Sequence, residues 1–370
     1  MTPNPPHIGI LAADLSDRHG WARYSLNVIR ALQAAGARVT VIAARNSPPI
    51  ADVDVLPMLP TVEPLDRGML LRQLRVLRAA RAALRSCDVI HSLIEPYAPL
   101  AAALAGERPL FVTGHGSYVR ASVIRRPPAR TIYAAAFRRA LMICVSRYTA
   151  EVVETVIPGA RTAVVGNGVD FERFAPLERL PHPHPTVLCV GVVKPRKGTL
   201  DLVQAMALVR ESIPAVRCRI VGSLETDRPY VAQVRAAIRD LGLDETVELT
   251  GGLPNDALLH AYASADVFAL PSQNIDWKFE GFGLALLEAS AAGLPVIGSR
   301  DCGAADAVID GVTGLLVGQN DPVLLAQALT TLLTQPDTAR QMGYTGRAHA
   351  RMQTWDAVAE QLLALYAETP

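Results

Sequence analysis

Short apolar runs alternate with amphipathic stretches along most of this 370-residue chain. Near its start, apolar runs at 8–13 and 39–43 predict two strands. Between them, the apolar residues of 21–35 recur with the period of a helix, and Gly36 follows as a stop. The first residues therefore predict a strand–helix–strand unit.

The same alternation continues to the end of the chain. Further strands are predicted in the first half at 89–90, 112–116 and 142–145, and in the second half at 187–193, 218–221, 247–249 and 267–270. The second half also shows helical stretches at 200–209, 231–241 and 257–263. Strands that alternate with helices in this way predict an α/β protein with parallel sheets and helices on both faces.

A proline-punctuated stretch at 180–186, LPHPHPT, follows the Asn167-Gly168 turn and is typical of a linker. We therefore predict a first domain at 1–180 and a second at 181–354. Parallel sheets bind ligands at the carboxyl ends of their strands, and two such domains in series predict a site in the cleft between them.

Residues 279–299, FEGFGLALLEASAAGLPVIGS, predict a loop, a short helix starting near Leu284 and a buried strand. Gly281 and Gly283 allow close approach of a ligand, and the first amides of a helix have no partner within it, so such a helix start attracts phosphate. Glu288 lies one turn after Leu284 and could accept hydrogen bonds from hydroxyls. The alternative is an ordinary helix with acids near its positive end.

Composition excludes several protein classes. Half of the residues are apolar, but no run is long enough to span a bilayer. The first residues lack a basic start followed by a long apolar stretch, so we expect a soluble, cytosolic protein. The five cysteines are scattered without metal-ligand spacing, which predicts reduced core residues. We expect no metal site and no nucleic-acid partner.

The two halves of the chain differ in net charge. Residues 1–180 contain 22 arginines and no lysine against 14 acids, whereas the remainder has an excess of acids. A predicted helix at 67–85 carries six arginines interleaved with leucines. It could lie on an anionic membrane surface, or it could be a surface helix whose arginine stems cover apolar neighbours.

The three lysines of the chain, Lys194, Lys197 and Lys278, all fall in loops predicted to follow strands of the second domain. Because 33 arginines carry the remaining positive charge, this placement favours binding of an anion such as a diphosphate. A dinucleotide of the NAD type is disfavoured, since the first strand–helix turn has a single glycine, Gly20, instead of three.

These motifs together resemble retaining glycosyltransferases of family 4. The resemblance is carried by GNGVDFERF, VGVVKPRKG, VELTGGLP, ADVFALPS and residues 279–299, in that order, and by HGWARYSLNVIRALQAAGARVTVIA, VTGHGSY and the closing TWDAVAEQLLALY. It covers nearly the whole chain. It implies the GT-B architecture, in which two Rossmann-like, doubly wound domains face a cleft and residues 355–370 pack back on the first domain.

The resemblance also implies roles for individual residues in binding a nucleotide-diphosphate sugar, such as a UDP- or GDP-sugar. Lys197 contacts the diphosphate, Glu280 the donor sugar and Glu288 the ribose, while His115 faces the reacting sugar. The donor site would further include Gly20, Lys194, Arg196, Gly222, Leu253, Gly281, Phe282, Gly283 and Leu284. No separate cofactor is implied.

One position departs from the family pattern. Members usually carry an arginine directly after the glycine of the VGR…KG motif, where this chain has Val192. Lys194 or Arg196 could supply the charge, and the sequence leaves open which of them does so.

The expected reaction is metal-independent transfer of a sugar to an acceptor hydroxyl with retention of configuration. A hydrolase pair is disfavoured because Glu288 lies inside a helix, where it is better placed to bind hydroxyls than to attack. A nucleotide-sugar epimerase and a non-catalytic homologue remain alternatives. The acceptor is left open among glycans, lipid-linked acceptors and small molecules, with the 67–85 helix as a contact to the inner face of the membrane.

Overall fold

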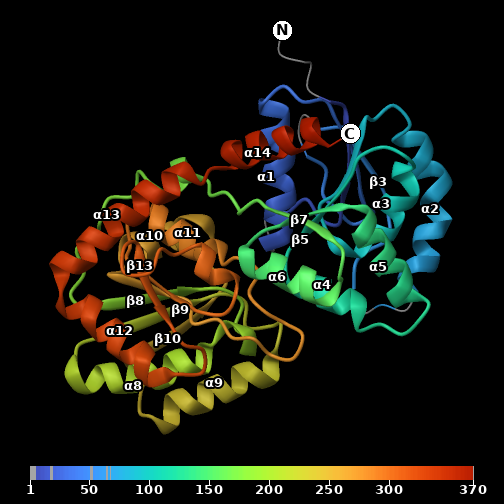
Figure 1. Cartoon of the computed structure of the whole chain (residues 1–370). Coiled ribbons are helices and arrows are strands. Elements are labelled where there is room, and N and C mark those ends of the chain that lie inside the picture. Colours follow the sequence, from blue (N-terminus) through green and yellow to red (C-terminus); the bar gives the residue numbers. More distant parts are fainter. Residues whose placement is uncertain (1–5, 17–19, 51–52, 64–65, 67, 370) are drawn as a thin grey trace. The chain divides into compact units, whose positions relative to one another are not determined.

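The computed structural model describes residues 6–16, 20–50, 53–63, 66 and 68–369, which fold into two compact units (Figure 1). Unit 1 consists of the described parts of Met1–Gly168 and Trp355–Pro370, and unit 2 is Val169–Thr354. Each unit is built on one parallel sheet.

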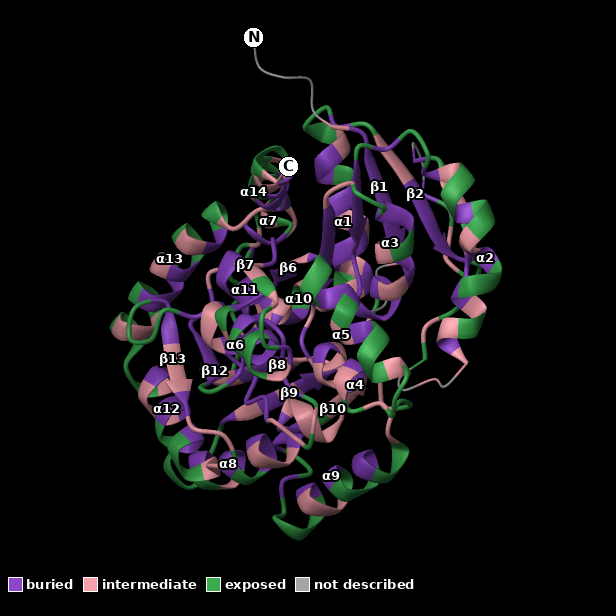
Figure 2. Ribbon diagram, turned by 45° about the vertical axis from the view of Figure 1, so that its right-hand side comes forward, coloured by how far each residue is buried: buried purple, intermediate pink, exposed green. Residues whose placement is uncertain are grey.

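The sheet of unit 1 has seven strands in the order β3-β2-β1-β4-β5-β6-β7, and every neighbouring pair is parallel. Its central strands are buried on both faces, as Figure 2 shows for β1, so they are almost wholly apolar. The strands are β1 (Ile8–Ala12), β2 (Val39–Ala44), β3 (Val55–Leu59), β4 (Val89–Ser92), β5 (Leu110–Gly114), β6 (Leu141–Cys144) and β7 (Arg161–Val164).

The helices of unit 1 cover its sheet. Helices α2, α3 and α5 lie side by side, while α1 packs against α14 (Figure 1). The helices are α1 (Gly20–Ala34), α2 (Met69–Ala83), the short 3-10 helix η1 (Glu95–Tyr97), α3 (Ala98–Ala105), α4 (Ser117–Val123), α5 (Ala129–Arg139), α6 (Arg147–Val156) and α14 (Trp355–Glu368).

Helix α14 follows unit 2 in the chain but completes the core of unit 1. The ring of Trp355 lies 5.7 Å from that of Tyr24, and the buried Tyr366 hydroxyl lies 2.6 Å from Nδ1 of His91. His91 in turn contacts the Thr113 hydroxyl through Nε2, at 2.9 Å. Because Tyr366 and His91 are fully or nearly fully buried, each satisfies the polar group of the other.

The sheet of unit 2 has six strands in the order β10-β9-β8-β11-β12-β13, again all parallel. The strands are β8 (Thr186–Val190), β9 (Arg217–Val221), β10 (Val247–Gly251), β11 (Val267–Ala269), β12 (Val296–Ser299) and β13 (Gly314–Val317). Its helices are α7 (Phe171–Phe174), η2 (Pro195–Lys197), α8 (Thr199–Ser212), α9 (Arg228–Asp240), α10 (Asn255–Ala263), α11 (Leu284–Ala291), η3 (Gly303–Asp306), α12 (Pro322–Thr334) and α13 (Pro336–Met352).

In each sheet, successive strands are added first toward one edge and then, after a single switch point, toward the other edge. In unit 1 this reversal of strand order lies between β1 and β4, and in unit 2 it lies between β8 and β11. Loops that leave the carboxyl ends of two such strands diverge, which opens a crevice where ligands bind in this class of sheet. The loops after β8 and β11 hold the predicted residues Lys194, Arg196, Lys197 and Glu280.

The prediction of two parallel-sheet domains with helices is confirmed. The boundary differs from the predicted 180/181 and lies between Gly168 and Val169. The reason is that Val169 donates its amide to the Gln353 carbonyl and α7 packs on α11, which joins these residues to unit 2.

Single elements also differ in their bounds. The helix predicted at 67–85 spans Met69–Ala83, and Arg67 lies outside the described residues. The strand predicted at 187–193 ends at Val190, because the chain turns at Gly191 into the loop that carries η2. The five cysteines are buried and free, as predicted.

Candidate active site

Two loops of unit 2 are joined at the carboxyl edge of its sheet. The loop after β8 ends at Gly198, which has a left-handed backbone, and a Cβ there would overlap the Pro271 carbonyl oxygen of the loop after β11. The Gln273 amide also donates to the Arg196 carbonyl, at 2.8 Å. Glycine therefore lets the two loops approach closely enough for their side chains to meet.

At this junction the carboxylate of Glu280 meets two cations. Its Oε2 lies 2.6 Å from Nζ of Lys197 and 2.9 Å from Nη1 of Arg196, and it also accepts a hydrogen bond from the Ser272 hydroxyl, at 3.1 Å. Glu280 is only 7% exposed. Burial opposes its ionisation, but Arg196 and Lys197 hold the pKa of this carboxyl well below its usual range.

Lys194 and Lys278 add positive charge to the same place. The pKa of Lys194 is lowered to about 8, mainly by burial and also by the neighbouring charges of Arg196 and Lys197, while Glu280 has the opposite effect. The Lys278 ammonium also acts on Lys194 and lies 5.5 Å from the centre of the Trp277 ring. Arg196 and Lys197 thus contact the Glu280 carboxylate, Lys194 acts on it at longer range, and Lys278 acts on Lys194. Positive charge gathered in this way attracts a multiply charged anion.

Helix α11 begins at Leu284, as predicted, after Gly283 in a left-handed conformation. The loop residues Gly281 and Phe282 lead directly from Glu280 to this helix start. Glu288 lies on α11 with 6% exposure, and its Oε2 accepts a hydrogen bond from the Tyr262 hydroxyl, at 3.0 Å. Both acids of the 279–299 stretch are therefore buried and hydrogen-bonded.

Two other predicted residues of unit 2 lie in loops at the same edge of the sheet. Gly222 follows β9, and a Cβ there would overlap the Gly191 carbonyl oxygen, so glycine allows the β8 and β9 loops to touch. Leu253 follows β10 and is half-buried.

In unit 1, His115 follows β5. Its Nε2 donates to the Leu93 carbonyl, at 2.8 Å, and its ring packs edge-on against Tyr24 with 4.7 Å between centres. Burial lowers the pKa of His115 to about 4, so the imidazole is neutral near pH 7. Gly20 is the first residue of α1 and is exposed.

Sequence reasoning missed Glu95, the first residue of η1. Its side chain is fully buried, and its Oε1 accepts the amide hydrogen of His115, at 2.7 Å. Burial raises the pKa of Glu95 to about 8, although hydrogen bonds from the His115 and Gly116 amides oppose this. The sequence signal for this residue was an acid just after a predicted strand.

Glu95→Gln is expected to change how stability depends on pH. The folded pKa of Glu95 lies above its usual value, so its contribution to stability is complete below about pH 4.5 and is lost as pH rises toward about 8. Relative to the glutamine variant, the wild-type protein should lose up to about 1.4 kcal/mol per pH unit in this window. Thermal unfolding at pH 5, 6.5 and 8 measures this, with the exposed Glu154→Gln as control. Parallel curves for wild type and Glu95→Gln would contradict the expectation.

A separate cavity of about 450 Å³ lies at the opposite, amino edge of the unit 2 sheet. Its lining includes the strand starts Thr186, Arg217 and Val247 together with His184 and His260. None of the predicted donor residues lines it.

Within the described part of the chain, no group of three or more His, Cys, Asp or Glu is placed to hold a metal ion. The described helices include none that is both long and apolar enough to cross a bilayer.

Comparison with known proteins gives two family matches. Residues 18–173 match the model of Glycosyltransferase Family 4, and residues 170–349 match that of Glycosyl transferases group 1. The GDP-mannose-dependent alpha-(1-6)-phosphatidylinositol monomannoside mannosyltransferase of Mycolicibacterium smegmatis is 35% identical over 268 residues, which is 68% of this chain and 67% of the relative. The D-inositol 3-phosphate glycosyltransferase of Corynebacterium efficiens is 36% identical over 58% of this chain and 51% of the relative.

Solved structures match over almost the full length. Sucrose-phosphate synthase from Thermosynechococcus elongatus has a TM-score of 0.81 and 25% identity, with 98% of each chain covered. Anabaena HepE in complex with UDP and glucose has a TM-score of 0.78 and 19% identity, covering 98% of this chain and 99% of that one. The likeness confirms the predicted GT-B architecture.

Proposed function

Since this chain belongs to glycosyltransferase family 4, we propose that it moves a sugar from a nucleotide-diphosphate sugar to an acceptor hydroxyl, with retention of configuration and without a metal ion. The observation that carries this proposal is the cluster of Arg196, Lys197 and Glu280 at the strand-order reversal of unit 2. The cluster combines cations for a diphosphate with a buried acid for the sugar.

Each cluster residue has a role in the proposed reaction. As the bond between the sugar and the diphosphate breaks, negative charge grows on the departing phosphate oxygens. Lys197 and the first amides of α11 are fixed groups that stabilise this charge without reorganisation. Glu280 accepts hydrogen bonds from hydroxyls of the donor sugar, and Glu288 accepts those of the ribose.

Arg196 is the residue that we propose in place of the arginine usually found at Val192. Its guanidinium approaches the same carboxylate oxygen as Lys197, so the two cations lie at one point of the junction. A guanidinium also suits bidentate binding of phosphate better than the Lys194 ammonium does. Lys194 then contributes charge at longer range.

In unit 1, His115 and Gly20 are the residues that we propose for contacts with the reacting sugar and the diphosphate. A neutral imidazole at His115 can accept or donate a hydrogen bond without adding charge beside the sugar. The buried Glu95 holds the His115 backbone, so it supports the loop.

A donor screen tests the function. The protein is mixed with GDP-mannose, the donor named for the mycobacterial relative, and with other GDP- and UDP-sugars, and release of nucleoside diphosphate is measured with and without EDTA. We expect release from at least one donor that EDTA leaves unchanged, and an anomeric NMR signal of the product that matches the donor. If calorimetry detects no nucleoside diphosphate binding at millimolar concentration, the proposal fails. An epimerised nucleotide sugar formed without acceptor would also overturn it.

For the acceptor, we propose a lipid-linked molecule at an anionic membrane surface. Helix α2 has no acidic residue and exposes Leu71 and Leu74, each 64% exposed, beside the exposed Arg75 and Arg78. Exposed leucines among arginines suit a surface with anionic headgroups and an apolar layer beneath. The mycobacterial relative is also named for a phosphatidylinositol-based acceptor.

Vesicle sedimentation tests this contact. We expect the protein to sediment with vesicles that contain about 30% phosphatidylglycerol, to stay in solution with pure phosphatidylcholine, and to detach as salt rises. The variant Leu71→Ser/Leu74→Ser should lose most of this binding, because burial of each leucine contributes about 1.5–3 kcal/mol. Arg228→Ala, a surface arginine of α9, serves as the control. Equal sedimentation of wild type and the leucine variant would contradict the role of α2.

A further inference from the structure

Tyr262 lies next to the proposed ribose site without being one of the family motif residues described above. It occupies the last turn of α10, its side chain is fully buried, and its hydroxyl donates to Oε2 of Glu288, at 3.0 Å. A buried hydrogen bond to a carboxylate is stronger than one between neutral groups. This contact therefore has the strength to hold the Glu288 side chain in one rotamer.

Aromatic rings from two other elements fix the tyrosine ring. Phe174 of α7 meets it edge-on with 5.3 Å between centres, and Phe268 of β11 stacks on it at 6.0 Å with an angle of 14°. Phe174 and Phe268 are themselves buried. The ring is thus held by α7 and β11, and its hydroxyl reaches α11.

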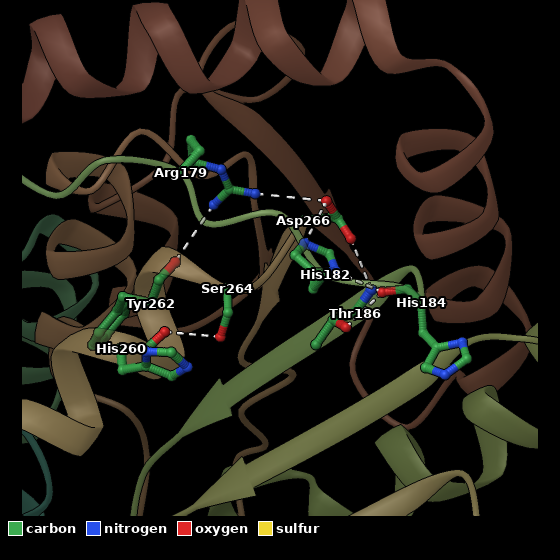
Figure 3. A network of polar contacts seen from close by, with 8 residues as sticks. All are labelled: Arg179, His182, His184, Thr186, His260, Tyr262, Ser264 and Asp266. Carbon is green, nitrogen blue, oxygen red and sulfur yellow. Dashed lines mark hydrogen bonds and ion pairs between the residues drawn. The ribbon is translucent and has the colours of Figure 1, made fainter.

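The backbone around Tyr262 is fixed as well, as Figure 3 shows. The Tyr262 carbonyl accepts a hydrogen bond from Arg179, at 3.4 Å, and Arg179 lies 3.6 Å from Asp266. Asp266 also accepts the Thr186 amide at 2.8 Å and lies 3.3 Å from His182. The segment 179–186 therefore holds the end of α10, and Tyr262 with it, against β8 and β11.

We propose that Tyr262 is a positioning residue that orients the Glu288 carboxylate toward the ribose hydroxyls of the donor. This inference rests on the ribose role of Glu288 under the proposed function. Without the tyrosine hydroxyl, the carboxylate can rotate away from the orientation that two neighbouring hydroxyls need, and binding must then restore that orientation. The ring of a phenylalanine would keep the packing with Phe174 and Phe268.

The experiment compares nucleotides that have and lack the ribose hydroxyls. Calorimetry measures binding of GDP, UDP and their 2′,3′-dideoxy forms to wild type, Tyr262→Phe, Glu288→Ala and the double variant. We expect Tyr262→Phe to weaken binding of the better ribonucleotide about tenfold. Binding of the dideoxy form should stay unchanged, and kcat at saturating donor should change less than twofold. The double variant should bind like Glu288→Ala, because the tyrosine acts only through that acid.

A matched control is Tyr133→Phe. Tyr133 is a buried tyrosine of unit 1 whose hydroxyl donates to the Pro96 carbonyl, at 3.0 Å, so its loss tests the general cost of deleting a buried hydroxyl. This variant should bind both nucleotide forms like wild type.

The outcomes separate the inference from the function on which it rests. Suppose that Glu288→Ala abolishes the preference for ribose. If Tyr262→Phe then weakens binding of the ribose and dideoxy nucleotides equally, or weakens binding of neither, the positioning role of Tyr262 is wrong while the ribose role of Glu288 stands. If Glu288→Ala keeps the wild-type preference for ribose, Glu288 does not bind the ribose, and the positioning role of Tyr262 is contradicted as well.

Discussion

Glu280→Ala is expected to lower kcat of sugar transfer at least about a thousandfold, the scale seen when a preorganised polar group at a reacting centre is removed. The carboxylate lies between Arg196 and Lys197, and these cations hold its pKa well below its usual range despite its burial. In the proposed reaction it accepts hydrogen bonds from the donor sugar. Steady-state kinetics with the donor identified by the screen measures the loss.

The same variant should bind free nucleoside diphosphate at least as tightly as wild type. Removing Glu280 leaves Arg196 and Lys197 without their shared carboxylate, so both can turn fully to the phosphates. Calorimetry separates this gain from the loss of transfer. Glu245→Ala, at the amino edge of the same sheet, is the control for loss of an acid. Retained transfer, or loss of transfer and of diphosphate binding together, would contradict the role given to Glu280.

Lys197→Met is expected to reduce kcat/KM by about two to three orders of magnitude, because it removes a charge that grows more important as the diphosphate departs. Methionine matches the aliphatic stem of lysine without the ammonium group, so packing of that stem against Gly191 changes little. In contrast to Glu280→Ala, this variant should lose both diphosphate affinity and kcat.

A comparison of three single variants decides which residue supplies the phosphate contact of the arginine that family members usually carry at the position of Val192. Arg196→Met should weaken diphosphate binding nearly as much as Lys197→Met does, since both cations meet at Glu280. Lys194→Met should cause a smaller loss. The reverse order would assign the role to Lys194, and wild-type kcat/KM in Lys197→Met would contradict the proposed diphosphate site.

Much of the fold follows from local patterns. The strands around Ile10 and Leu188, the start of α11 at Leu284 and the gathering of three lysines were all predicted, because periodicity, glycine placement and charge type are local properties. The alternation of strands and helices predicted parallel sheets, whereas the strand order that brings the loops after β8 and β11 together is seen only in the structure.

Partners distant in sequence could not be predicted in the same way. Tyr262 and Glu288 lie on different helices, and Glu95 meets His115 across two neighbouring strands. The roles of these pairs depend on which helix face is buried and on how loops turn after Ser92 and Gly114. The unit boundary was misplaced because Val169 pairs with residues close to Thr354, a contact without any local signal.

The return of α14 to unit 1 sets the order in which the protein can be completed during translation. Unit 2 is continuous in sequence, so it can fold as soon as it leaves the ribosome. Unit 1 is made first, yet Tyr24 and His91 receive their partners Trp355 and Tyr366 only after all of unit 2 has been synthesised. Unit 1 of a nascent molecule therefore keeps part of its core uncovered until the last residues of the chain have been made.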